Sequence, residues 1–232
     1  MFCKYCGKSI DEDSTFCRFC GKPQGVISYT ESLFDKNIPT TGMSNGHEWV
    51  DLGLSVKWAT CNIGAKDPTD KGLFFAWAET EAKDFYSEDT YKLKSFWGGY
   101  KKIGNNIAGT RYDAAAVQWG GLWRMPTKEE MLELIDSCSW EWTKVNGVKG
   151  CIISRNCNQI FLPYTTAISG RGTLGISSGS YWTDTLHYDN FTGCMSFVWT
   201  LIFGSDFKQI DGLVNRILGH LIRPVLDDKY YK

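Results

Sequence analysis

The sequence has no apolar run close to the ~20 residues needed to cross a bilayer. It begins Met1-Phe2-Cys3-Lys4, without the apolar stretch of a secretory signal peptide. The formal net charge of the 232 residues is only −1, so no overall field attracts nucleic acid or anionic lipid. These absences predict a cytoplasmic protein that has no membrane span and binds no nucleic acid.

Residues that commonly carry catalysis are also scarce. The three histidines, His47, His187 and His220, lie in unrelated contexts, and no glycine-rich phosphate loop or serine nucleophile elbow is present. A single histidine is more often a hydrogen-bonded structural residue than a general base. We therefore expect a protein that is not an enzyme.

Aromatic residues, by contrast, are plentiful: ten Trp, eleven Tyr and thirteen Phe. Apolar residues make up 43% of the chain and charged residues 22%, which is typical of a globular protein. The length suits one ordinary domain with a small appendage. Aromatic side chains fill cores and also anchor ligands, so their number alone favours neither role.

A duplicated cysteine motif opens the chain. Cys3 and Cys6 are followed by Gly-Lys, and so are Cys17 and Cys20. Two residues between thiolates allow one tight turn to direct both sulfurs at one tetrahedral ion, and the glycine permits the positive φ of such a turn. The pattern predicts one structural Zn²⁺ with four protein thiolate ligands. The alternatives are a redox pair or a chance cluster.

The other five cysteines are scattered and odd in number: Cys61, Cys138, Cys151, Cys157 and Cys194. A secreted disulfide framework would normally pair completely, which again favours the cytoplasm.

This opening segment resembles the short zinc-ribbon domains at the start of many bacterial multidomain proteins. It has few apolar residues, and we expect these to be buried: Phe2, Tyr5, Ile10, Phe16 and Phe19. So small a core does not offset the entropy of ordering the segment, so the metal is required for folding. Its basic and acidic residues differ by only one charge, which favours a protein-contact or adaptor role over nucleic-acid binding.

The composition divides the chain into three parts. Residues 1–23 form the zinc ribbon, residues 24–45 a linker rich in Ser, Thr and Gly with one short strand possible at 26–29, and residues 46–228 the larger domain.

The larger domain has many short elements. Strands are predicted at 47–52, 56–60, 73–77, 140–145, 148–154, 160–162, 181–182, 195–203 and 220–225. A helix is predicted at 112–119, and a second follows the capping box that starts at Thr127. Asn146-Gly147 is the signal of a type I′ hairpin. Two helices followed by irregular β structure indicate an α+β fold.

Ordered motifs in this domain resemble a known family. They are HEWVDLGLSVKWA (47–59), FAWAET (75–80), WGGLWRMPT (119–127), IFLP (160–163), YWT (181–183) and IRPV (222–225). Together they are similar to the Fibrobacter succinogenes major paralogous domain, abundant in gut Bacteroidetes. The resemblance covers residues 47–225 and implies a C-type-lectin-like fold, which hosts enzymes, sugar binders and hypervariable protein binders.

Two of these activities lack their motifs. The related formylglycine-generating, sulfatase-modifying enzymes bind copper through a close pair of C-terminal cysteines, whereas residues 164–232 contain only Cys194. Calcium-dependent lectins of this fold use Glu-Pro-Asn or Gln-Pro-Asp with Trp-Asn-Asp, and none of these strings occurs. The nearest cluster is Asp184 with Asp189 and Asn190. Both activities remain the alternatives to binding without chemistry.

A third activity, binding of a protein or other macromolecule, fits residues 164–222, which are rich in aromatics with nearly balanced charges. The predicted ligand-binding residues are Tyr181, Asp184, His187, Tyr188, Asn190, Phe191 and Asp206. All of these except Asp184 are expected to be exposed. About half of Trp182, Phe197, Trp199 and Phe203 are expected to be core. The segment is similar in position to the variable region of diversity-generating retroelement proteins, and this resemblance implies a hypervariable segment; ordinary sequence drift is the alternative.

Four further residues are predicted to support the scaffold. Trp119 and Trp123 are expected to pack the helices onto the sheet, and Arg124 and Arg223 to make buried charge-assisted hydrogen bonds.

Overall fold

The computed structural model describes residues 2–3, 6, 8–11, 16–20, 22, 40–173, 178–188 and 196–227. The chain forms two compact units, Met1–Ile38 and Pro39–Lys232. The strand considered at 26–29 lies outside the described residues. No helix in the described part of the chain is long and apolar enough to cross a membrane.

A five-stranded antiparallel sheet joins distant parts of the larger unit. Its strands, in spatial order, are β1 (Thr41–Ser44), β2 (His47–Val50), β3 (Lys57–Ala59), β13 (Val225–Leu226) and β4 (Trp123–Arg124). Strand β13 pairs with β3 on one side and β4 on the other. The end of the chain's described part therefore completes a sheet begun by its first strands.

Strand β1 lies where the linker was predicted, so the predicted linker extends too far. Asn45 and Gly46 have φ of 46° and 81° and connect β1 to β2 as a two-residue hairpin. Positive φ at both turn positions is the condition that Asn-Gly satisfies most readily. Asn45-Gly46 is therefore the same hairpin signal as Asn146-Gly147.

Both predicted helices form. Helix α1 (Ala114–Trp119) begins at the N-cap Asp113, whose carboxylate accepts hydrogen bonds from the amides of Ala115 and Ala116. Gly120, at φ 66°, ends it. Helix α2 (Lys128–Ser137) has the full capping box between Thr127 and Glu130.

The remaining strands form three smaller antiparallel sheets. They are β5 (Ser139–Val145), β6 (Val148–Arg155) and β7 (Asn158–Pro163); β8 (Ile168–Ser169) and β9 (Gly172–Thr173); and β10 (Gly179–His187), β11 (Phe197–Phe203) and β12 (Lys208–Asn215). The hairpin at Asn146-Gly147 is confirmed, with φ of 49° and 81°.

Several strand predictions differ from the structure. Strands β4, β8, β9 and β12 were not predicted, and β12 mixes Gly and Asp with apolar residues. Of the strand predicted at 220–225, only Val225 lies in a strand, β13. The strand predicted at 73–77 is absent; Phe75 makes only an isolated bridge to His220, and consecutive residues there are buried rather than alternating.

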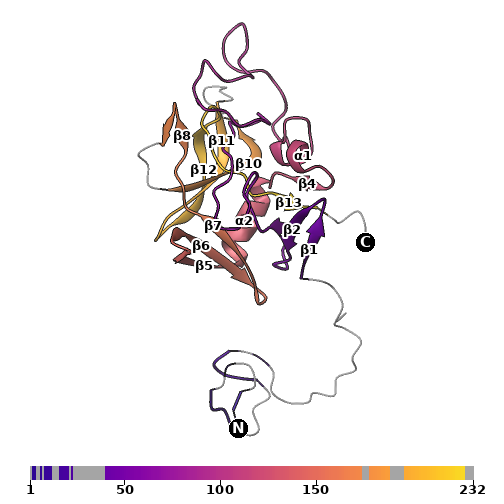
Figure 1. The fold of residues 1–232 in the computed structure, drawn as a ribbon, viewed down its shortest axis with the longest axis vertical. Coiled ribbons are helices and arrows are strands. Elements are labelled where there is room, and N and C mark those ends of the chain that lie inside the picture. The colour runs from indigo at the N-terminus through magenta and orange to yellow at the C-terminus, as the bar shows by residue number, and fades with distance from the viewer. Residues whose placement is uncertain are drawn as a thin grey trace. The chain divides into compact units, whose positions relative to one another are not determined.

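Tryptophan side chains form a large part of the hydrophobic core. Six are buried: Trp49, Trp58, Trp77, Trp119, Trp123 and Trp182. One cluster surrounds Trp77, Trp123 and Trp182, and a second joins β2, α2 and the sheet of β10 to β12. Figure 1 shows α2 between these strands, with its residues Met131 and Leu134 fully buried. The larger unit is mostly antiparallel β structure with two short helices in its described part, an α+β arrangement as predicted.

The predicted scaffold residues make the expected kinds of contact. Trp119 stacks on His47 with ring centroids 3.7 Å apart, and Trp123 meets Trp119 edge to face at 5.0 Å, which joins α1 to β2. Arg223 is fully buried and donates to Asn62 Oδ1 and to the carbonyls of residues 59, 60 and 161. Burial lowers the pKa of the Arg223 guanidinium.

Candidate metal centre and ligand groove

The same backbone hydrogen bond occurs in both cysteine motifs of the N-terminal unit. The amide of Cys3 donates to the carbonyl of Lys8 at 2.9 Å, and that of Cys17 donates to Lys22 at 2.8 Å. Each hydrogen bond closes a turn around one pair of cysteines. The amide of Phe19 also donates to Cys17 Sγ at 3.4 Å, which orients that sulfur.

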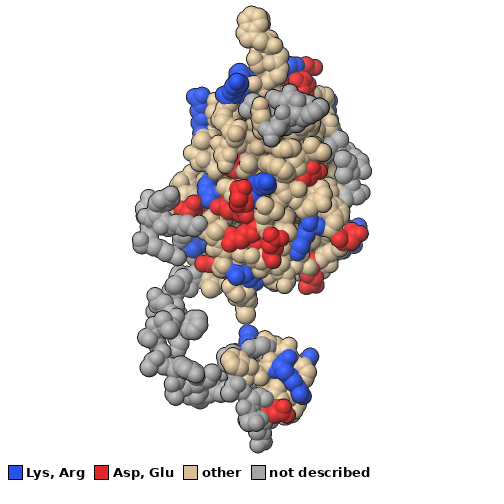
Figure 2. All heavy atoms as spheres, turned by 180° about the vertical axis from the view of Figure 1, so that it is seen from behind, with Lys and Arg blue, Asp and Glu red and all other residues tan. Residues whose placement is uncertain are grey.

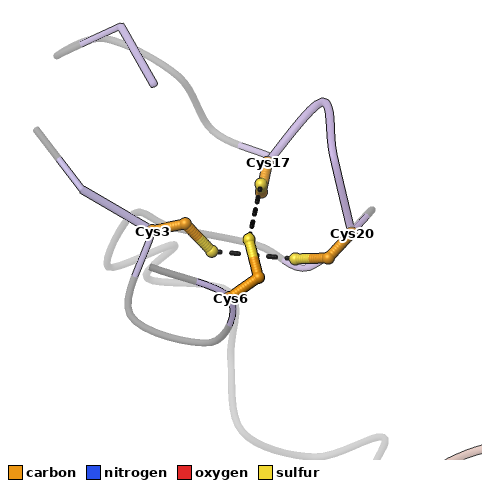
Figure 3. A group of neighbouring side chains, drawn as sticks. All are labelled: Cys3, Cys6, Cys17 and Cys20. Atoms are coloured by element: carbon orange, nitrogen blue, oxygen red, sulfur yellow. Dashed lines mark hydrogen bonds between the residues drawn. The ribbon is translucent and has the colours of Figure 1, made fainter. Parts of the chain in front are cut away.

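The four sulfurs form one group (Figure 3). All Sγ atoms lie within 4.8 Å of one another, with Cys3 to Cys20 at 3.7 Å and Cys6 to Cys17 at 3.6 Å. Four sulfurs at about 2.3 Å from a tetrahedral zinc ion would be separated by about 3.8 Å. Donor type, number and spacing therefore fit zinc. In the described part of the chain no other group of three His, Cys, Asp or Glu side chains could hold a metal.

The same crowding disfavours thiolates when no cation is present. The amide of Lys22 lowers the pKa of Cys20, but desolvation and the three neighbouring thiols outweigh it and raise the pKa to about 12. The pKa of the Cys6 thiol is raised as well: the Lys8 amide lowers it, but desolvation and the thiols of Cys3 and Cys17 oppose it. A bound cation would displace these protons, since thiolate is the ligating form.

The predicted burial of the ribbon's aromatics is wrong. Phe2, Phe16 and Phe19 are 75%, 57% and 49% exposed, whereas Ile10 is buried with Cys3 and Cys17. The small described interior of the unit is formed by Cys3, Ile10 and Cys17 alone. Tyr5 lies outside the described residues.

In the larger unit, the expected exposure of Tyr181 is wrong. Tyr181 is fully buried; its hydroxyl donates to the Pro163 carbonyl at 3.0 Å and accepts from Asn62 Nδ2 at 3.2 Å. Asp184 is also buried and accepts from Thr185 Oγ1 at 2.6 Å and from the Ala108 amide at 3.3 Å. Burial raises the pKa of Asp184 to about 6. Neither side chain reaches the surface.

The other predicted ligand residues lie in different surroundings. His187 is half-buried, donates from Nδ1 to the Gly212 carbonyl at 2.5 Å and lies 4.5 Å from the Trp199 ring. Tyr188 is 48% exposed, and Asp206 is exposed in the turn between β11 and β12. Asn190 and Phe191 lie outside the described residues. Of the aromatics expected to be about half core, Trp182 and Phe203 are buried and Phe197 and Trp199 half-buried.

Asp206 lies in an open groove of about 450 Å³, which we call the β5–β12 groove. Its lining residues come from two hairpins far apart in the sequence: Trp140, Trp142, Cys151, Gly204, Ser205, Asp206, Phe207 and Lys208. Trp140 and Trp142 are two residues apart on β5 and so project from the same face of the strand. Lys208 Nζ lies 5.2 Å from the Trp140 ring centroid.

The tight turn at residues 204–207 forms the other wall of the β5–β12 groove. The Gly204 amide donates to the Phe207 carbonyl at 2.9 Å. A Cβ atom at Gly204 would lie 2.5 Å from the Phe207 ring, so only glycine lets the ring pack against this turn. The groove thus combines indole and phenyl surface with a carboxylate, an ammonium and a hydroxyl group.

Most of these groove residues were not predicted as ligand residues. The alternation of Trp140 and Trp142 with charged Glu141 was a usable signal for a partly exposed aromatic strand face. Of residues 204–208 only Asp206 was predicted, because the position of the other four beside β5 depends on the unpredicted strand β12.

Comparison with known proteins identifies the N-terminal unit. Residues 2–24 match the family model of the zinc-ribbon domain. No curated protein and no solved structure gave a significant match to the chain. The chain therefore carries an N-terminal zinc-ribbon domain with four clustered cysteines as a candidate metal site.

Proposed function

We propose that the chain is a non-catalytic binding protein. In this proposal the larger unit is a C-type-lectin-like module that binds a macromolecular partner through the β5–β12 groove and its surrounding C-terminal loops. The zinc ribbon is an adaptor held by one structural Zn²⁺ per chain. The groove is the observation that carries the proposal, since it places aromatic surface beside Asp206 and Lys208.

The composition of the groove supports binding of a partner. Aromatic side chains dominate the energetics of many interfaces, and flanking charged groups fix orientation. Phe207 is 41% exposed, so its ring is available to a partner. Trp142 is half-buried and lies edge to face with Tyr164 at 5.2 Å, which holds the indole in place before binding.

Four thiolates leave zinc no open coordination position, so the ion would supply stability and no reaction centre. The ordered sequence motifs and the α+β element pattern support the C-type-lectin-like assignment of the larger unit. We also propose that its exposed C-terminal positions are the variable residues of a diversity-generating retroelement protein.

Site-specific photocrosslinking tests the binding proposal. A photoreactive phenylalanine analogue replaces Phe207, and in a matched control it replaces Val117, which is 52% exposed on α1. In extract of the source cells, we expect one discrete crosslinked species from position 207, lost when Trp142→Ala is added. Equal crosslinking from both positions, or none from position 207, would contradict a binding role for the groove.

A further inference from the structure

Phe96 and Trp97 are almost completely exposed, at 92% and 91%. All ten tryptophans lie in the described part of the chain, and apart from Trp97 each is buried or half-buried. The two rings contact each other edge to face, with centroids 5.2 Å apart. Adjacent aromatics projecting into water are unfavourable in a free monomer and mark an interaction site.

The loop that carries these residues, which we call the aromatic tip (residues 94–100), has a fixed base. The Lys101 amide donates to Leu93 at 2.8 Å, and the Ser95 amide donates to Gly99 at 2.9 Å. Tyr100, at the end of the tip, packs edge to face against buried Tyr91 at 5.4 Å. These contacts fix the backbone of the aromatic tip, from which both exposed rings project.

Positive charge accompanies the aromatic tip. Residues 90–112 contain Lys92, Lys94, Lys101, Lys102 and Arg111 and no acidic residue. Lys92 pairs with a glutamate at 2.5 Å, and Lys94 lies 3.7–3.9 Å from two acidic side chains. Lys101 and Lys102 are exposed and make no ion pair with a described residue, so their charge is not offset.

The aromatic tip is convex. The segment between β3 and α1 forms the end of the larger unit beyond β11 in Figure 1, and Figure 2 shows a narrow uncharged projection there with both basic and acidic groups near its base. A rigid binding partner would need a matching cavity. A lipid interface needs none, since headgroups and acyl chains rearrange around an inserted ring.

We propose that the aromatic tip docks peripherally on an anionic lipid bilayer. Trp and Phe favour the boundary between headgroups and acyl chains, where an indole has both apolar contact and water for its N–H. Lysines behind the tip extend their ammonium groups to anionic headgroups. The apolar contact of the rings and the electrostatic attraction of the lysines both act at the aromatic tip, although the whole chain carries a net charge of only −1. This site is separate from the β5–β12 groove and does not depend on the proposed function.

Vesicle co-sedimentation of the full zinc-loaded chain tests this proposal. We expect binding to phosphatidylcholine vesicles that contain phosphatidylserine, weaker binding to phosphatidylcholine alone, and further weakening as salt is added. Phe96→Ser with Trp97→Ser should reduce the partition coefficient at least about tenfold, and Lys101→Glu with Lys102→Glu should reduce it on anionic vesicles. Met43→Ser, at a 61% exposed apolar residue on β1, should bind like the unaltered chain.

Brominated lipid adds a readout specific to insertion. It should quench part of the tryptophan fluorescence of the unaltered chain and less of that of Trp97→Phe, which keeps an aromatic tip. Absence of sedimentation, or sedimentation that the double serine variant retains, would overturn the proposal. A concentration-dependent dimer that the double variant abolishes would overturn it too, because the aromatic tip would then bind a second copy of the chain.

Discussion

Arg124 and Glu130 are joined by two parallel hydrogen bonds, from Nη1 to Oε2 at 2.8 Å and from Nη2 to Oε1 at 2.5 Å. The same Glu130 carboxylate accepts from the Thr127 amide at 2.9 Å, which completes the capping box of α2. Arg124 also reaches Asp227 at 3.1 Å. One side chain on β4 therefore holds the start of a helix and the segment after β13.

Replacing Arg124 with Met should destabilise the larger unit. The Arg124 and Glu130 side chains are only 15% and 11% exposed, so the variant leaves a largely buried carboxylate without its partner. We expect a loss of about 3 kcal/mol in the free energy of unfolding and a fall in melting temperature of roughly 10 °C. Arg111→Met, at an exposed arginine, is the control for differential scanning calorimetry. Equal melting temperatures for the two variants would show that the pair contributes nothing.

Metal removal should unfold the zinc ribbon and leave the larger unit folded. The described core of the ribbon consists of Cys3, Ile10 and Cys17, too little apolar surface to order the segment alone. Native mass spectrometry should find one zinc and no calcium per chain, and Cys17→Ser should lose the zinc. Amide exchange after chelation should accelerate only before residue 39. A second tightly bound metal would contradict the assignment of a single structural site.

Asp184 should make the free energy of unfolding decrease as pH rises, the opposite of the usual effect of a carboxylate. Its pKa rises from 3.8 to about 6 on folding because of burial, so the folded state holds the proton more tightly. This contribution is therefore largest below pH 4 and is lost as pH rises through 6, a change of about 3 kcal/mol.

Asp184→Asn removes this titration and keeps a hydrogen-bonding side chain. The difference in unfolding free energy between Asp184→Asn and the unaltered chain should shift in favour of the variant between pH 4 and pH 7. Urea titrations at both pH values measure it, and a difference that stays constant with pH would rule out this effect of Asp184.

If the retroelement proposal is right, sequence variation among sibling isolates should follow exposure. Within residues 181–221 we expect substitutions at Tyr188, Asp206, Phe207 and Leu213, which are exposed. Tyr181, Trp182 and Leu201 are fully buried and should not vary. Sequencing the locus from related strains checks this, and substitutions spread evenly over the chain would exclude a targeted mechanism.

Local signals predicted local structure well. The cysteine spacing predicted the sulfur cluster, the capping box predicted α2, and Asn146-Gly147 predicted a hairpin. Each depends on residues close together in sequence, where turn geometry and helix caps act.

Features that depend on contacts between residues distant in sequence were predicted less well. Tyr181 is set among turn-forming residues, yet it is buried because Pro163 and Asn62 satisfy its hydroxyl, and neither partner is close to it in sequence. The β5–β12 groove was missed for the same reason, because its two walls lie on hairpins separated by about sixty residues.

The pairing of β13 between β3 and β4 also sets the order of events during synthesis. Val225 and Leu226 leave the ribosome long after residues 57–59 and 123–124. Until then β3 and β4 each have one edge whose backbone groups lack their native partner strand. At synthesis rates of about 5–20 residues per second, the interval from the ribbon to β13 lasts roughly 10–40 s. The ribbon can bind metal during that time, whereas the larger unit acquires its native sheet only when β13 emerges. A chain truncated before residue 225 would therefore combine a folded ribbon with a sheet open to aggregation.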